Sequence, residues 1–154
     1  MAMRVSTEDF DISAEIAKLS SGDTGIGGVA SFVGKVRGEV RGQALISMTL
    51  EHYPGMTEAE LERIEAEART RFKLSAASIV HRVGDLKPGD NIVLVIACAS
   101  HRQDAFAGAE FLMDYLKTRA PFWKKETLAD GSADWVDARE SDEEAVSAWQ
   151  SASR

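Results

Sequence analysis

The chain has 154 residues, of which 44% are hydrophobic and 28% are charged, and its formal net charge is −7. This length suits one ordinary domain with its own core, and the composition is typical of a soluble globular protein. The negative charge argues against general nucleic-acid binding, which needs a basic face. The longest apolar run, residues 92–99, is too short to cross a bilayer, and no apolar signal segment follows the first methionine. We therefore expect a cytoplasmic protein that binds neither membranes nor nucleic acid.

Cys98 is the one cysteine, which excludes an internal disulfide framework and a cysteine-based metal cluster. It lies inside the apolar run, where a thiol behaves as a small, inert core side chain. His52, His81 and His101 are too far apart in the sequence for a zinc motif. His52 and His81 fall inside predicted strands, and we interpret both as structural. The sequence thus predicts neither a metal site nor a bound cofactor.

The first half of the chain predicts a helix over residues 11–19 and then two strands. The first strand lies within residues 25–37 and leads into a glycine-flanked turn at 38–42. The second strand, residues 44–53, is predicted to follow it in a hairpin.

A capping box of Thr57 and Glu60 predicts the start of the next helix. Apolar residues then recur at three- and four-residue spacing, which predicts one buried face. This face consists of Leu61, Ile64, Ala68 and Phe72.

The second half predicts strands over residues 76–83 and 91–99, joined through a turn at 87–90. The second of these strands is apolar on both faces, which is typical of a sheet centre or a subunit interface. A helix is predicted over residues 103–118. Its apolar stripe is predicted to contain Phe106, Ala109, Leu112, Met113 and Leu116.

Pro121 must end that helix, because the residue before a proline is pushed out of the helical region. Residues 122–127 and 133–138 can then pair across a turn at 129–132. Hairpins and helices are interspersed without strict βαβ alternation, so the predicted fold class is α+β, with a largely antiparallel sheet and flanking helices. We expect one domain over residues 1–154, with a variable N-terminus over residues 1–25.

Cations gather around Pro121, in contrast to the acidic remainder of the chain. They are Lys117, Arg119, Lys124 and Lys125. One interpretation is that Lys117 and Arg119 simply complement the negative end of the helix dipole. The alternative is that the turn at Pro121 brings Lys124 beside Lys117. Two ammonium groups held close together favour a free amine for nucleophilic or acid–base work, and they form a positive site for an oxyanion or a phosphate.

His101 and Arg102 form a second candidate pair, where the apolar strand ends and the long helix begins. Free backbone amides at a helix N-terminus favour anions, so a site is conceivable here. A surface or capping pair explains the same two residues.

Six blocks occur in a set order along the chain. They are FVGKVR (32–37), LEHYPGM (50–56), HRVGDLKPGD (81–90), SHR (100–102), MDYLKTRAPFWK (113–124) and WVDAR (135–139). Together they resemble the large, catalytic subunit of molybdopterin synthases, the MoaE family. The resemblance extends from about Val29 to Trp149, and the twelve-residue block 113–124 is its most specific part.

The resemblance implies an α/β-hammerhead-like fold and a homodimer within a heterotetramer. A small ubiquitin-like subunit would sit at each end, and its C-terminal Gly-Gly, carrying a thiocarboxylate, would enter a pocket of the large subunit. The implied reaction is sulfur transfer from that thiocarboxylate to cyclic pyranopterin monophosphate (precursor Z), which forms the dithiolene of molybdopterin.

The resemblance also assigns roles to residues. Lys117 and Lys124 correspond to the catalytic lysines, and Phe32 and Met113 to the walls of the pocket for the partner's tail. Substrate-binding positions are matched by Arg37, His101, Arg102 and Arg139, some of them serving the neighbouring subunit. The match at Arg139 depends on that of Trp135.

Two other functions remain open from the sequence. A non-catalytic scaffold could bind a ubiquitin-like tail, but the presence of both Lys117 and Lys124 argues against it. A phosphate-ester hydrolase would also need an anion site, but the sequence shows neither a metal-ligand motif nor a nucleophile motif.

Overall fold

The computed structural model describes residues 3–136 and 140–151. Its helices are α1 (Ile12–Ser20), α2 (Met56–Arg71), α3 (Arg102–Arg119) and α4 (Glu140–Ser151). Its strands are β1 (Met3–Ser6), β2 (Gly28–Lys35), β3 (Glu39–Val40), β4 (Gln43–His52), β5 (Ala76–Arg82), β6 (Gly84–Leu86), β7 (Asn91–Ala99), β8 (Phe122–Leu128) and β9 (Ala133–Val136). Within this part of the chain, no helix is both long and apolar enough to cross a membrane.

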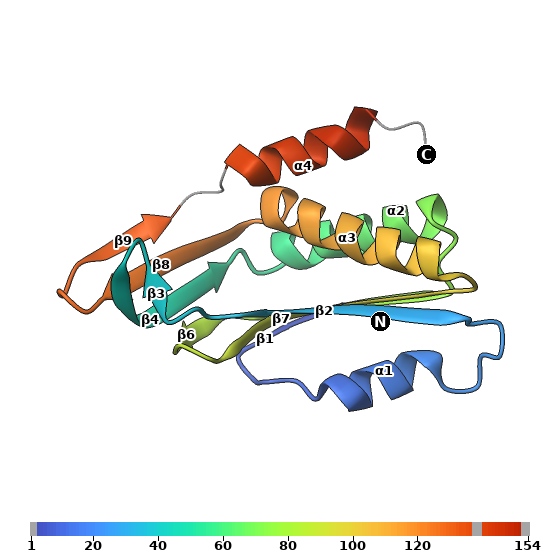
Figure 1. The fold of residues 1–154 in the computed structure, drawn as a ribbon, viewed down its shortest axis with the longest axis horizontal. Helices are drawn as coiled ribbons and strands as arrows, with labels where there is room; N and C mark the ends of the chain where they lie inside the picture. The colour runs from blue at the N-terminus through green and yellow to red at the C-terminus, as the bar shows by residue number, and fades with distance from the viewer. Residues whose placement is uncertain (1–2, 137–139, 152–154) are drawn as a thin grey trace.

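The strands form two sheets that lie end to end. The first has the order β1-β5-β7-β2, and only its β1–β5 pair is parallel. The second has the order β3-β4-β8-β9, with β6 also paired to β4, and is antiparallel throughout. Helices α2 and α3 cover one face of the first sheet, α1 covers the other face, and α4 lies over α2 and α3 (Figure 1). The predicted α+β class with a largely antiparallel sheet is confirmed.

Strand β7 and helix α3 form the centre of the larger core. β7 lies inside the first sheet, and its residues from Val93 to Ala99 are at most 3% exposed. The helix packs closely on this strand at Gly108, where an added Cβ would lie 2.9 Å from the Leu74 methyl carbons and 3.4 Å from the Cβ of Ala97. A side chain at this position would therefore have to displace the Leu74 methyl groups.

The hairpin predicted between the first two long strands is wrong. β2 pairs with β7, whereas β4 belongs to the second sheet and pairs with β8. The tight turn lies between β3 and β4, where Arg41 and Gly42 both have positive φ, 50° and 79°. Two positive φ values suit the two-residue turns that join antiparallel strands, so the turn was found at the right residues but assigned to the wrong strand.

The predicted capping box of α2 is also wrong, although the buried face of the helix is confirmed. The helix begins at Met56, and the backbone N–H of its N-cap, Gly55, donates to the carboxylate of Glu58 over 2.9 Å. Thr57 lies inside the first turn and is fully buried. Its hydroxyl donates to the Pro121 carbonyl and accepts from the Tyr53 N–H just before the helix, and it does not cap the helix.

The buried surface of α3 is broader than the predicted stripe. Phe106 is 66% exposed, whereas Phe111 and Tyr115 are buried. The helix contacts β7 and β2 on one side and both α2 and α4 on others. A single stripe could not anticipate the second contact surface, so Phe106 was assigned to the core in error.

Helix α4 is held against α2 and α3 mainly through Trp149. Its indole Nε1–H donates to Asp114 over 2.6 Å, and the Arg71 guanidinium donates to its backbone carbonyl over 2.7 Å. The same guanidinium lies 5.4–5.6 Å from the ring centroids of Phe72, Phe111 and Trp149. Aromatic faces stabilise the charge of this partly buried cation.

Candidate functional site

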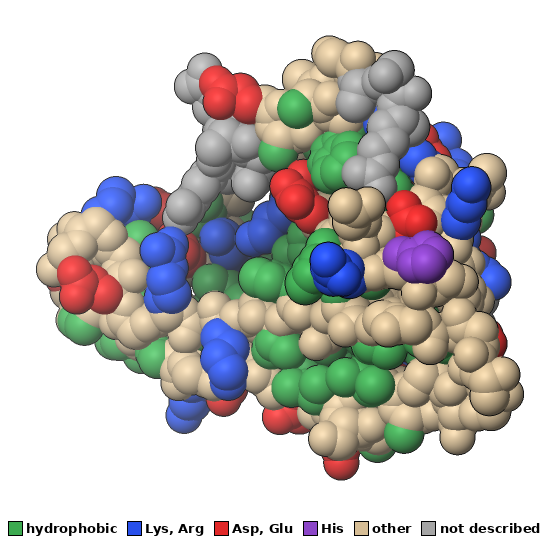
Figure 2. Space-filling view, turned by 45° about the vertical axis from the view of Figure 1, so that its right-hand side comes forward, with side chains coloured by type: hydrophobic (Ala, Val, Ile, Leu, Met, Phe, Trp, Pro, Cys, Tyr) green, Lys and Arg blue, Asp and Glu red, His purple; other side chains and the backbone are tan. Residues whose placement is uncertain are grey.

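A cavity of about 450 Å³ opens where the two sheets meet beneath the C-terminal end of α3. This volume is in the range of small-molecule sites. Figure 2 shows a hollow with Lys and Arg side chains inside it and hydrophobic side chains around it. Its charged lining residues are Lys35, Arg37, Lys117, Lys124 and Glu126.

The turn at Pro121 brings Lys117 and Lys124 to this one cavity. Lys117 lies in the last turn of α3, and Lys124 lies on β8, opposite Leu50 of β4 and Val136 of β9. Lys124 Nζ lies 4.0 Å from the carboxylate of Glu126, which is 6% exposed. A buried carboxylate two residues away on the same strand face directs the Lys124 side chain inward.

The other two cations of the cluster lie elsewhere. Lys125 points to the opposite face of β8, with its Nζ 5.8 Å above the Trp135 ring. The Arg119 guanidinium lies 5.8 Å from the Tyr115 ring and 4.0 Å from Glu143. The structure thus separates two cavity lysines from two surface cations that the sequence presents together.

The turn between the two cavity lysines is tightly fixed. Ala120 has an extended backbone, and the Phe122 N–H donates to the Ala120 carbonyl over 2.9 Å, which closes a three-residue turn around Pro121. The Thr57 hydroxyl donates to the Pro121 carbonyl over 2.9 Å. It also accepts from the Tyr53 N–H over 2.9 Å.

The cavity is cationic in a protein of net charge −7. Four of its lining residues are Lys or Arg and one is acidic. Arg37 follows the end of β2, and the side chains of Phe32 and Met113 add apolar wall. A low-dielectric pocket with excess positive charge attracts and orients an anionic ligand. No three His, Cys, Asp or Glu side chains of the described residues are grouped to hold a metal ion.

His81 also lines the cavity, which the sequence did not reveal. It is 5% exposed, and its Nδ1 lies 2.7 Å from the Arg82 carbonyl. Burial, with a smaller effect from nearby Lys117, lowers the pKa of His81 to about 4. Strand alternation places His81 on the same face as Ile79, toward α3. This alternation is the feature of the sequence from which the buried position of His81 could have been predicted. The site therefore contains a neutral imidazole beside a lysine.

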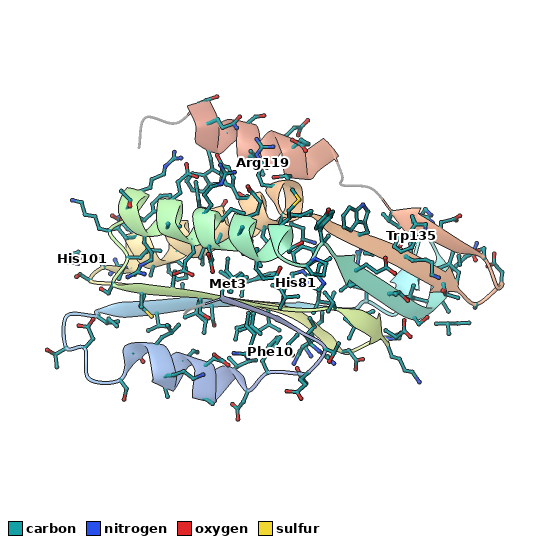
Figure 3. All side chains as sticks on the ribbon, turned by 180° about the vertical axis from the view of Figure 1, so that it is seen from behind. Met3, Phe10, His81, His101, Arg119 and Trp135 are labelled. Carbon is teal, nitrogen blue, oxygen red and sulfur yellow. The ribbon has the colours of Figure 1, made fainter. Side chains whose placement is uncertain are left out.

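His101 and Arg102 do not reach this cavity within one chain. They lie at the opposite end of α3, about 24 Å from Lys117 along the helix axis. Figure 3 shows His101 at one end of the molecule, Trp135 near the other end, and His81 between them. Arg102, which directly follows His101, lies beside the start of β2, since a Cβ on Gly28 would be 3.5 Å from the Arg102 Cα. Arg139 lies outside the described residues.

The chain matches the family model described as MoaE protein over residues 5–119. It is 53% identical to the molybdopterin synthase catalytic subunit of Mesorhizobium japonicum over 152 residues, which cover 98% of this chain and 94% of the relative.

Solved structures give the same result. The fold is similar to that of the molybdopterin biosynthesis MoaE protein from Burkholderia ambifaria, with a TM-score of 0.83, 54% identity, and coverage of 99% of this chain and 100% of the other. It is also similar to molybdopterin synthase from Staphylococcus aureus, with a TM-score of 0.79, 29% identity, and coverage of 86% and 94%. The chain therefore belongs to the MoaE family, the catalytic subunits of molybdopterin synthase, enzymes of molybdenum cofactor biosynthesis.

Proposed function

We propose that the cavity between the two sheets is the sulfur-transfer site of this enzyme. In it, sulfur passes from the C-terminal thiocarboxylate of a small ubiquitin-like subunit to cyclic pyranopterin monophosphate, which gives molybdopterin. The observation that carries the proposal is the convergence of Lys117 and Lys124 on one cationic cavity of an acidic protein. Both the thiocarboxylate and the phosphorylated pterin are anions that such a cavity favours.

The sulfur arrives on the partner, so this chain needs no nucleophilic thiol of its own. Cys98 is fully buried in the first sheet, and burial raises the pKa of its thiol. A protonated, enclosed thiol is a poor nucleophile. Its environment is therefore consistent with a mechanism in which the catalytic subunit positions reactants rather than carrying sulfur.

The two lysines stabilise negative charge at the reacting centre. Lys117, in the last turn of α3, is the residue we place beside the thiocarboxylate, and Lys124 approaches from the β8 side. Preorganised cations in a site that excludes water act on developing charge without reorganisation during the reaction. Arg37 at the cavity edge is suited to the substrate phosphate, because a guanidinium can bind two phosphate oxygens at once. Phe32 and Met113 form the apolar wall along which a slender Gly-Gly tail enters.

His101 and Arg102 complete the site of a second copy of this chain. Among the described strands, β2 pairs only with β7, so its other edge is open. Two β2 edges paired antiparallel across a twofold axis would set the Gly28 end of one against the Lys35 end of the other. The eight residues of β2 span about 26 Å, close to the separation of about 24 Å between His101 and Lys117. A symmetric dimer of this kind brings each helix N-terminus to the partner's cavity.

Reconstitution tests this function directly. The purified chain is mixed with a thiocarboxylated small subunit and precursor Z, and molybdopterin is measured by fluorescence of its oxidised pterin. We expect product that depends on all three components. A complex that forms with the small subunit but yields no product would show a scaffold and would exclude the proposed activity.

A further inference from the structure

Thr57 connects the start of α2 to the turn at Pro121, which lies 64 residues later in the chain. Its hydroxyl accepts from the Tyr53 N–H after β4 and donates to the Pro121 carbonyl between α3 and β8, both over 2.9 Å. The side chain is fully buried. A hydroxyl has only one proton to donate. Thr57 donates it to the Pro121 carbonyl and accepts from the Tyr53 N–H.

These contacts are not required to begin α2. Gly55 and Glu58 satisfy the N-terminus of that helix, since the Gly55 N–H donates to the Glu58 carboxylate over 2.9 Å. A threonine within a first turn ordinarily serves a local cap. Here the hydroxyl donates instead to the Pro121 carbonyl, in the turn between the two cavity lysines.

The Pro121 carbonyl needs this partner. A part-buried carbonyl without a hydrogen bond is unfavourable, and the flanking turn uses the Ala120 carbonyl rather than that of Pro121. If the Thr57 hydroxyl were absent, the Pro121 peptide would turn toward another donor. The peptide plane sets the direction in which β8 leaves, and therefore where Lys124 lies relative to Lys117.

We propose that Thr57 is a positioning residue of the sulfur-transfer site, which fixes the relative placement of Lys117 and Lys124 through the Pro121 carbonyl. This inference rests on the proposed function of the cavity. Thr57 contacts neither the cavity nor the reacting atoms, and acts only through the turn. It also couples that turn to the 53–56 segment, whose Tyr53 and Met56 are 53% and 57% exposed.

The test compares Thr57→Val with Thr57→Ser in the reconstituted complex. Valine keeps the shape but not the hydroxyl, whereas serine keeps the hydroxyl. A displacement of about 1 Å at reacting groups can cost about 100-fold in rate, so we expect Thr57→Val to lower kcat by about 10- to 100-fold. Because the cation set is intact, KM for precursor Z and affinity for the small subunit should stay within about threefold. Thr57→Ser should restore most of kcat.

Ile96→Val is the matched control for lost stability. Ile96 is fully buried among residues of the α1 side of the first sheet, away from the turn. We expect it to lower Tm and leave kcat unchanged. Equal loss of kcat in Ile96→Val and Thr57→Val would overturn the positioning role, as would a Thr57→Val enzyme with normal kcat. Thr57→Ala, which also lacks the hydroxyl, provides the same comparison if the valine variant does not fold.

A second readout does not depend on catalysis. Loss of the acceptor should accelerate hydrogen exchange of the Tyr53 amide in Thr57→Val, without the same change in the β7 amides. Unchanged Tyr53 exchange would contradict the inference even if the wild-type chain made no molybdopterin. If the wild-type chain were inactive but Tyr53 exchange were accelerated in Thr57→Val, the proposed function would be refuted, while the structural role of the Thr57 hydroxyl would stand.

Discussion

The imidazole of His81 stacks on the ring of Phe122, with the centroids 3.8 Å apart and the planes 16° from parallel. Phe122 begins the strand that carries Lys124, so β5 of the first sheet supports the start of β8 in the second. The Arg82 carbonyl can only accept, and Nδ1 therefore carries the ring proton. The buried ring is therefore held as the neutral tautomer with its proton on Nδ1.

Stability should fall in mild acid because of His81. Its folded pKa, about 4, lies below the ordinary value of 6.5, so between these values the unfolded chain binds a proton that the folded chain does not. Acidification therefore favours unfolding, and from pH 7 to pH 5 this one group should remove about 2 kcal/mol of the free energy of unfolding. Urea unfolding at both pH values measures the change.

His81→Asn is the control for that measurement. Its side-chain amide can donate to the Arg82 carbonyl but does not titrate, so the variant should show a smaller loss of stability between pH 7 and pH 5. Equal losses in the two proteins would show that His81 is not the group responsible.

Helix α4 should depend on Trp149 for its attachment. Trp149→Ala removes an edge-to-face contact with Phe72 at 5.5 Å and another with Phe111 at 5.6 Å, together with the hydrogen bond to Asp114. We expect the free energy of unfolding to fall by about 3 kcal/mol. Trp135→Ala, at a tryptophan that is 53% exposed, should cost less than about 1 kcal/mol. A similar cost for both would contradict the packing described for α4.

Sequence reasoning succeeded where one local rule decided the outcome. β7 was predicted with its exact limits, 91–99, because its apolar run ends abruptly on both sides, and α3 was predicted to within one residue at each end. The approach of Lys124 to Lys117 at Pro121 was one of two interpretations of these cations, and both lysines line one cavity. These features depend on short segments and on the chain directly beside them.

Prediction from the sequence failed where contacts between distant segments determine the structure. Gly55 and Thr57 both resemble N-caps, and only the position of Pro121 shows that the Thr57 hydroxyl is used elsewhere. His81 lies in a predicted strand, but its place in the cavity depends on the packing of β8 against β5. Phe106 fits the spacing of a buried helical stripe but is exposed, because α3 also packs against α4 and buries other residues.

Arg37 should matter for substrate affinity more than for turnover. It lies at the cavity edge, and loss of a charge-assisted hydrogen bond to the phosphate should raise KM for precursor Z by about 10-fold or more. Steady-state kinetics of Arg37→Ala give the value. Lys18→Ala, on α1 at the other face of the sheet, should leave KM unchanged. A normal KM in Arg37→Ala would remove this residue from the site.

Mixing two inactive variants tests whether the site is shared between copies. In a dimer of Lys117→Ala with His101→Ala, one cavity carries both changes and the other carries neither. Random reassociation should therefore restore about a quarter of wild-type activity. Mixtures that stay inactive, although the subunits exchange, would show that both residues act within one chain, whereas an active His101→Ala variant on its own would show that His101 is not part of the site.

We propose that the lysine facing the cavity, rather than the local abundance of positive charge, supports sulfur transfer. Lys117→Ala and Lys125→Ala each remove one lysine from the cation cluster around Pro121, but Lys125 lies over Trp135 on the opposite face of β8. Molybdopterin formation and small-subunit affinity are measured for both variants. The structure predicts that Lys117→Ala binds the small subunit and forms no molybdopterin above background, while Lys125→Ala remains close to wild type. Normal product formation by Lys117→Ala would contradict the assignment of the cavity as the catalytic site.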